Sequence, residues 1–286
     1  MNFQSKRKKI KSSIKRNLKL YGILLALSLI LVLLILAPYI APNDPYAVDL
    51  DNILRSPDKT YPLGTDSLGR CVLSRILYGG SRTIFSALTV VILTAVFGTF
   101  IGVFSGYSGG NLDKFIMRIV DIFLAFPGLV LAIAVAGVLG GGITNAMISI
   151  ALISWTKYAR IARGKVVEIK DETFIKAARL TGNSDMYIMF KHVIPNIVPY
   201  IVVTASLDIG TTIMEIASLS FLGLSSPLPF PEWGAMISEG KSYIQFAPWT
   251  ILAPGLAILI VVVLFNLLGD TVHDILDFKQ KRRVYK

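Results

Sequence analysis

The sequence predicts an all-α membrane protein with six transmembrane helices. Of its 286 residues, 53% are hydrophobic and only 16% are charged. The charged residues stand in blocks that separate four long uncharged runs, over residues 20–43, 83–112, 122–156 and 242–269. Each run reaches the roughly 20 residues that a helix needs to cross about 30 Å of hydrocarbon. Such runs are typical of a chain that lies mostly within a bilayer.

The six helices are expected near residues 20–41, 82–106, 117–139, 143–163, 197–220 and 249–268. The run from 122 to 156 is long enough for two crossings, and the glycine cluster at 137–144 suits a tight turn between them, outside the hydrocarbon. The fifth helix is interrupted only by Asp208 and Glu215. Arg118 and Asp121, at i and i+3, are expected to form an ion pair at the end of the third helix.

The distribution of Lys and Arg predicts the orientation of the chain, because basic loops stay in the cytoplasm. With a cytoplasmic N-terminus, all but six of the 29 Lys and Arg residues lie on the cytoplasmic side. The six outside are Arg55, Lys59, Arg70, Arg75, Arg82 and Lys241. Both termini are therefore predicted to be cytoplasmic. The net charge of +11 then reflects topology, and no nucleic-acid partner is needed to explain it.

The chain is expected to divide near residue 80. Residues 1–80 hold a basic N-terminus, the first helix and an external segment, and residues 81–286 hold a five-helix core with a cytoplasmic loop at 157–196. The apolar run of the first helix is longer than the 7 to 15 residues usual in a cleaved signal peptide. We therefore expect it to remain as an anchor.

No catalytic or metal site can be assembled from the sequence. The single cysteine, Cys71, allows neither an internal disulfide nor a cysteine-based metal cage. Both histidines, His192 and His273, fall on the predicted cytoplasmic side. The stretch "GAMISEGKS" at 234–242 has five residues between its glycines, whereas the phosphate-binding loop has four. The chain is thus expected to be neither an enzyme nor a nucleotide-binding protein.

The cytoplasmic segment from Lys157 to Lys191 is much longer than a connection between neighbouring helices requires, and loops of this size are usually functional. Its sequence predicts two short helices. The first is expected to be capped by Asp171 and to end at Gly182, which can adopt a left-handed conformation. The second is expected to start at Asn183 or Ser184 and to stop before Pro195. Ala177 and Ala178 would give the first helix a small face that another protein can approach closely.

The same segment carries a family resemblance. "KAARLTG", followed after nine residues by "HVIP", resembles the EAA loop of bacterial ABC importer permeases. Ala177, Ala178, Gly182, Ile194 and Pro195 match that pattern, while Lys176 replaces an acidic residue and His192 an aliphatic one. Further blocks resemble the dipeptide, oligopeptide and nickel permeases: "PLGTDSLGRCVLSRILYG", "MRIVDIFLAFP", "SLSFLGL", "PEWGAMI" and "FNLLGD".

The resemblance implies a type I ABC importer permease fold in the bacterial cytoplasmic membrane. It also implies four kinds of partner, namely a second homologous permease, two ATP-binding subunits, an external solute-binding protein and the surrounding lipids. ATP and Mg would be bound by the partner ATPase and no cofactor by this chain. The loop would be the coupling helix that contacts the ATPase, through Lys176, Ala177, Ala178, Gly182, Ile194 and Pro195.

The fifth helix carries a polar stripe in steps of three and four residues, made of Thr204, Asp208, Thr211, Glu215 and Ser218. Ionisable groups facing lipid are costly, so the stripe should face the protein interior or a water-filled path. Two interpretations stay open. The carboxylates could attract a cationic or zwitterionic cargo, such as a peptide or chelated nickel. Alternatively, they could hydrogen-bond to neighbouring helices and hold the gate or the permease dimer together.

Two function classes fit a chain of this kind. One is the passive permease subunit of an ATP-driven importer. The other is a self-sufficient ion-coupled carrier or channel, which would be expected to show internal repeats with interrupted helices and more ionisable residues within the membrane. The sequence shows no clear repeat and does carry a long docking loop, which favours the permease.

Overall fold

The computed structural model describes residues 3–224 and 229–284, and side chains over residues 18–224 and 229–276. It is helical almost throughout, and the described residues hold no β-strand beyond an isolated bridge between Thr65 and Cys71. The long helices are α1 (Phe3–Ile35), α3 (Val72–Ser108), α4 (Gly110–Leu124), α5 (Gly128–Val138), α6 (Ile143–Ile169), α9 (Ile194–Phe221) and α11 (Trp249–Val284). The short elements are α2 (Ala37–Ile40), η1 (Leu50–Asn52), α7 (Thr173–Leu180), α8 (Asp185–Ile188), η2 (Met189–Val193), α10 (Trp233–Gly240) and η3 (Lys241–Tyr243).

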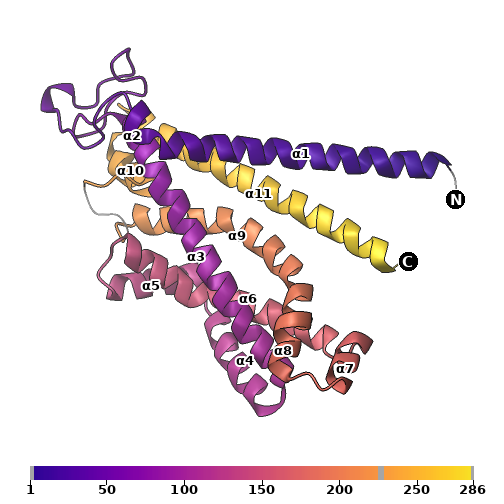
Figure 1. Cartoon of the computed structure of the whole chain (residues 1–286). Coiled ribbons are helices and arrows are strands. Elements are labelled where there is room, and N and C mark those ends of the chain that lie inside the picture. The colour runs from indigo at the N-terminus through magenta and orange to yellow at the C-terminus, as the bar shows by residue number, and fades with distance from the viewer. Residues whose placement is uncertain (1–2, 225–228, 285–286) are drawn as a thin grey trace.

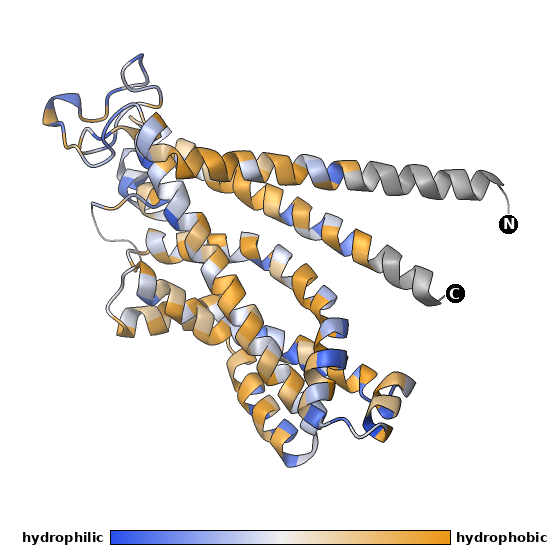
Figure 2. Ribbon diagram, in the orientation of Figure 1, coloured by the Kyte–Doolittle hydropathy of each residue, from blue (hydrophilic) through white to orange (hydrophobic). Residues whose placement is uncertain are grey.

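The helices run between two polar ends. The irregular segment between α2 and α3 lies at one end, and α7 and α8 lie at the other, together with the turn between α3 and α4 (Figure 1). The start of α1 and the end of α11 also point away from the irregular segment (Figure 1). Hydrophobic residues dominate the long helices, whereas hydrophilic ones gather near the two ends (Figure 2). This arrangement suits a bundle that crosses a bilayer.

Four helices of the described chain are long and apolar enough to span a membrane: Leu18–Ile35, Val72–Ser108, Asp185–Phe221 and Trp249–Leu276. A fifth span is possible if α4 and α5, bent by 87°, form one broken crossing. The 27-residue helix α6 is not among them, and its second half carries Lys157, Arg160, Arg163 and Lys165. The all-α membrane fold is thus confirmed, while the count of six spans stays a prediction.

Two predicted helix boundaries are wrong, and proline explains both. The single helix expected at 117–139 is broken at Pro127, because proline disfavours a helical conformation in the residue before it. The stop expected before Pro195 does not occur. There a π-helical turn at Met189–Val193 leads directly into α9, and Pro195 lies in the first turn of α9, where a backbone N–H is not required.

The helices α3 and α6 form the centre of the bundle, packed along their lengths at unusually close range. A Cβ atom added to Gly98 would lie 2.3 Å from the carbonyl oxygen of Trp155, and one added to Gly102 would lie 2.2 Å from that of Ala159. Small residues four apart let two membrane helices approach to backbone contact. Both α9 and α4 pack against the two helices of this pair, and η2 packs against α3.

Candidate functional site

The predicted coupling loop folds as a rigid appendage of the bundle, the α7–α8 insert (residues 171–193). Ile175 and Ala178 of α7 and Ile188 of α8 are buried in an apolar cluster with residues of α3, α6 and α9. Gly182 has φ +81°, so the predicted left-handed turn after α7 is confirmed. Ser184 caps α8 by accepting a hydrogen bond from the Tyr187 N–H at 3.3 Å. Buried contacts and a specific turn therefore fix the insert to the bundle.

The N-terminal cap of α7 differs from the prediction. Glu172 occupies the cap position instead of Asp171, and its side chain makes no capping hydrogen bond. The free N–H groups of the first turn of α7 thus have no carboxylate partner from this residue. Burial of Ile175 and Ala178 holds the short helix instead, because tertiary packing is the main source of helix stability in proteins.

A polar contact that the sequence did not reveal ties the insert to α3. The Tyr107 hydroxyl donates a hydrogen bond to Asp185 at 2.7 Å and accepts one from Arg179 at 3.0 Å. The hydrogen bond with Tyr107 raises the pKa of the Arg179 guanidinium, which stays charged. Tyr107 lies 78 residues before Asp185, so nothing local in the sequence signals the pairing. The end of α3 and both helices of the insert are thereby joined.

Only one of the two alanines that were predicted to form a small face on α7 is exposed. Ala177 is exposed, whereas Ala178 packs into the apolar cluster. Lys176 and Gly182 are also exposed, as is Pro195, and Ile194 is half-buried. Among the large hydrophobic side chains of the insert, Leu180 is the most exposed, at 88%. The sequence did not single it out. An apolar side chain presented to this degree on a rigid support can serve as an anchor for another protein surface.

The polar stripe of α9 divides into members with different roles. Asp208 is buried, and its carboxylate lies 2.5 Å from Lys157 Nζ of α6. This carboxylate therefore holds two helices together, as one of the two interpretations expected. Glu215 is half-buried, and no hydrogen bond to it is found among the residues that the structure describes. Whether Glu215 contacts a cargo, the other interpretation, stays a prediction.

The three hydroxyl groups of the stripe bond within α9. Thr204, Thr211 and Ser218 donate to the carbonyl oxygens of Tyr200, Asp208 and Met214, at 3.0, 2.9 and 2.7 Å respectively. A hydroxyl satisfied in this way can still accept a hydrogen bond from a passing ligand, because its oxygen keeps a lone pair. These residues can line a path but do not define a binding site by themselves.

Asp121 does not pair with Arg118 as predicted. Its carboxylate binds Arg160 of α6 instead. Because α4 packs against α6, the cross-helix arginine satisfies the carboxylate. Arg118 makes no hydrogen bond or ion pair with any part of the chain that the structure describes.

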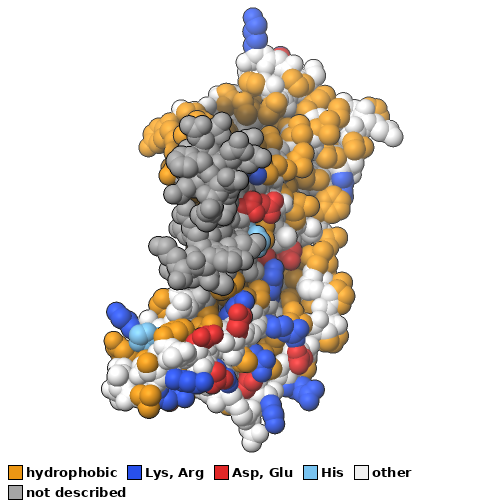
Figure 3. Space-filling model, turned by 90° about the vertical axis from the view of Figure 1, so that its right-hand side faces the viewer, with side chains coloured by type: hydrophobic (Ala, Val, Ile, Leu, Met, Phe, Trp, Pro, Cys, Tyr) orange, Lys and Arg blue, Asp and Glu red, His pale blue; other side chains and the backbone are white. Residues whose placement is uncertain are grey.

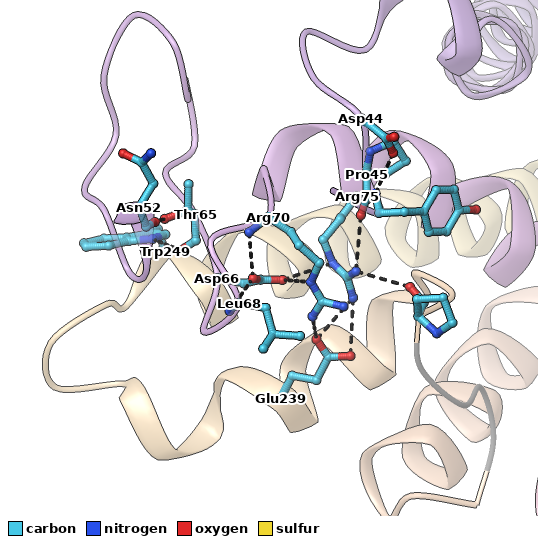
Figure 4. Close-up of polar contacts among 12 residues, drawn as sticks. Asp44, Pro45, Asn52, Thr65, Asp66, Leu68, Arg70, Arg75, Glu239 and Trp249 are labelled. Atoms are coloured by element: carbon cyan, nitrogen blue, oxygen red, sulfur yellow. Dashed lines mark hydrogen bonds and ion pairs between the residues drawn. The ribbon is translucent and has the colours of Figure 1, made fainter. Parts of the chain in front are cut away.

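A buried ionic cluster lies at the opposite end of the molecule, formed by Asp66, Arg70, Arg75 and Glu239 (Figure 4). Arg70 bonds Asp66 at 2.7 Å and Glu239 at 2.5 Å, and Arg75 bonds Glu239 at 3.1 Å. The side chains of the two arginines are 1% and 0% exposed. Four alternating charges compensate one another here, as buried ions require. The cluster fastens the segment before α3 to α10.

The stretch that resembles a phosphate-binding loop is part of this arrangement. Residues 234–240 belong to α10, and the side chain of Glu232 caps that helix by accepting hydrogen bonds from Gly234 and Ala235. A phosphate-binding loop must present free backbone N–H groups, and these two are occupied. The helix and its cap thus leave these two N–H groups unavailable to a phosphate group.

Known proteins resemble the chain over most of its length. Residues 98–282 match the family described as "Binding-protein-dependent transport system inner membrane component". The chain is 40% identical over 267 residues to the dipeptide transport system permease protein DppC of Alkalihalophilus pseudofirmus, covering 93% of this chain and 88% of that one. It is 44% identical over 254 residues to the glutathione transport system permease protein GsiD of Escherichia coli, covering 88% and 84%.

A solved structure shares the fold. The methionine ABC transporter MetNI in its inward-facing conformation matches with a TM-score of 0.57 at 20% identity, covering 69% of this chain and 94% of that one. The helical fold, the family match and the sequence identity over most of the chain all indicate the same family. The chain therefore belongs to the binding-protein-dependent transport system inner membrane components, as an ABC importer permease subunit of the dipeptide and oligopeptide type.

Proposed function

We propose that this subunit conducts short peptides across the bacterial cytoplasmic membrane, driven by ATP that a separate subunit hydrolyses. It pairs with a second homologous permease, and an external solute-binding protein delivers the cargo. Two ATP-binding subunits carry ATP and Mg on the cytoplasmic side, where both termini of this chain lie. The positive-inside distribution of Lys and Arg supports this orientation.

The observation that supports the coupling role is the α7–α8 insert, fixed to the bundle, with Leu180 exposed at the end of α7. ATP-driven closure of two cytoplasmic subunits moves membrane helices only through an element that is fixed to those helices. The insert is joined to α3 through Tyr107 and continues into α9 without a break. A displacement of the insert is thus transmitted to the helix that bears Asp208 and Glu215.

Two observations support short peptides as the cargo: the names of the related permeases and the carboxylate of Glu215. The related permeases carry names for dipeptide and glutathione transport, and both cargoes are short peptides with an ammonium group. The free carboxylate of Glu215 favours such a group by charge. Chelated nickel is the competing cargo. A bare metal ion is less suited, because the stripe offers no His or Cys ligand.

Uptake in cells that lack only this chain tests the cargo. We expect accumulation of a labelled dipeptide or of glutathione to be lost, and accumulation of nickel to be unchanged. Loss of nickel uptake alone would overturn the peptide assignment. The carrier alternative is tested by reconstituting the chain by itself, where ion-driven transport without ATP would contradict the permease role.

A further inference from the structure

A basic groove lies between α4 and α6, away from the polar stripe of α9. It encloses about 640 Å³ and is lined by Asp113, Lys114, Met117, Arg118, Asp121, Arg160, Arg163 and Gly164. The hydrogen bond from Tyr107 to Asp185 places the end of α3 beside the α7–α8 insert, and α4 begins directly after that end, at Gly110. Charged side chains gather over the lower part of the molecule, whereas the upper part is mainly hydrophobic (Figure 3). The groove therefore lies where the bundle leaves the hydrocarbon.

The charges of the groove do not balance. Its four cations face two carboxylates, and both carboxylates are already engaged. Asp113 is held by Arg163 through contacts of 2.7 and 3.1 Å and by the Ser105 hydroxyl at 2.6 Å. Asp121 is held by Arg160. The groove thus keeps two positive charges that its own acids leave uncompensated.

The two uncompensated cations are Lys114 and Arg118, one helical turn apart on α4. Both are exposed, and neither makes a hydrogen bond or ion pair within the described chain. Like charges at i and i+4 destabilise a helix by a few tenths of a kcal/mol. An external anion that bridges them would remove this repulsion. The arginine fork and the lysine ammonium both suit phosphate oxygens.

An apolar stripe lies directly beside the two cations on α4. Phe115 and Ile122, seven residues apart and so on the same side of the helix, are exposed. A soluble phosphate compound would bind the two cations only. A phospholipid would bind the cations through its headgroup and the apolar stripe through its acyl chains. Basic grooves between membrane helices near the cytoplasmic surface are suited to anionic lipid headgroups.

We propose that the basic groove binds the headgroup of an anionic phospholipid through Lys114 and Arg118, with the acyl chains lying along Phe115 and Ile122. The bound lipid fills the groove beside α6 and neutralises the end of the bundle from which the α7–α8 insert projects. This site is distinct from the cargo path and does not depend on which cargo the importer carries.

Binding of fluorescent phosphatidylglycerol to the purified full-length chain in detergent tests the proposal. We expect phosphatidylglycerol to bind more tightly than phosphatidylcholine. The double variant Lys114→Gln, Arg118→Gln should weaken this binding roughly 25-fold, since each basic residue near an anionic lipid surface contributes about fivefold. The control variant Lys59→Gln, Lys241→Gln removes the same charge at the other end of the chain and should leave binding unchanged.

Three results would overturn the proposal. One is equal binding of the two lipids, and another is unchanged phosphatidylglycerol binding by the Lys114 and Arg118 double variant. The third is displacement of the lipid by glycerol phosphate at equal concentration, which would assign the groove to a soluble phosphate compound. Should the double variant fail to fold, a photoactivatable phosphatidylglycerol on the unaltered chain decides. Adducts are expected within residues 112–122 or 157–164, and adducts confined to other helices would contradict the site.

Discussion

The two buried arginines show how much a single carboxylate can matter in this protein. Glu239 accepts hydrogen bonds from both Arg70 and Arg75, which water does not reach. Replacing Glu239 by Gln removes the charge but keeps the shape, and leaves Asp66 as the one carboxylate that pairs with the two arginines in the described chain. Breaking a buried ion pair costs about 3 to 5 kcal/mol. We expect a marked fall in the thermal unfolding temperature of the purified chain.

A surface ion pair of the same external segment is the control. Asp58 lies 2.7 Å from Arg55, and both side chains contact solvent. Asp58→Asn should cost less than about 1 kcal/mol, as is usual for exposed pairs. If the Glu239→Gln and Asp58→Asn variants melted at the same temperature, the ionic cluster would not stabilise the fold.

The two carboxylates of α9 should respond differently to neutralisation. Asp208→Asn removes the partner of Lys157 and should lower thermal stability by about 1 kcal/mol, because Lys157 is half exposed and keeps part of its hydration. Glu215→Gln should leave stability nearly unchanged but slow peptide uptake about fivefold, which corresponds to about 1 kcal/mol. Uptake and melting measured on both variants separate the roles. Normal uptake by Glu215→Gln would make the whole stripe structural.

The close packing of α3 against α6 predicts how two glycine substitutions should change the stability of the bundle. Gly102→Ala places a methyl group against the backbone of Ala159, and overpacking of this kind costs about 1 to 3 kcal/mol. Gly164→Ala on α6 meets open space and should be neutral or stabilising by up to about 1 kcal/mol, because alanine favours the helix. Thermal unfolding of both variants tests this pair, and equal stability would mean that α3 and α6 are not in backbone contact.

The elements also show what the sequence could and could not predict. Uncharged runs locate α1, α3 and α11, and an apolar run interrupted only by Asp208 and Glu215 locates α9, because hydrocarbon requires long apolar helices. The π turn at Met189–Val193 lets the helix pass Pro195, and no propensity anticipates it. Ala178 turns inward because α7 packs on the bundle through Ile175, which only the tertiary fold decides. The pairing of Arg70 with Glu239, 169 residues apart, has no local signal either.

For the whole molecule, the distribution of Lys and Arg predicts that both termini lie in the cytoplasm, and labelling tests this orientation. The native Cys71 is buried, so it contributes little background to labelling of engineered cysteines. We expect Lys59→Cys to react with an impermeant reagent added outside intact cells, and Leu180→Cys to react only once the cytoplasmic side is opened. The reverse pattern would invert the topology.

A matched pair of variants tests directly whether the α7–α8 insert couples a partner ATPase to the membrane helices. Leu180 and Val138 are equally exposed, at 88%, and are the last residues of α7 and α5, two helices that lie apart in Figure 1. In the importer reconstituted with its binding protein, the retention of the ATPase subunits and the rate of peptide uptake are measured for Leu180→Gln and Val138→Gln. The account predicts that Leu180→Gln lowers both the retention of the ATPase and peptide uptake about tenfold, a loss of about 1.4 kcal/mol at one apolar anchor, while Val138→Gln behaves as the unaltered chain. Unchanged retention and uptake in Leu180→Gln would contradict it.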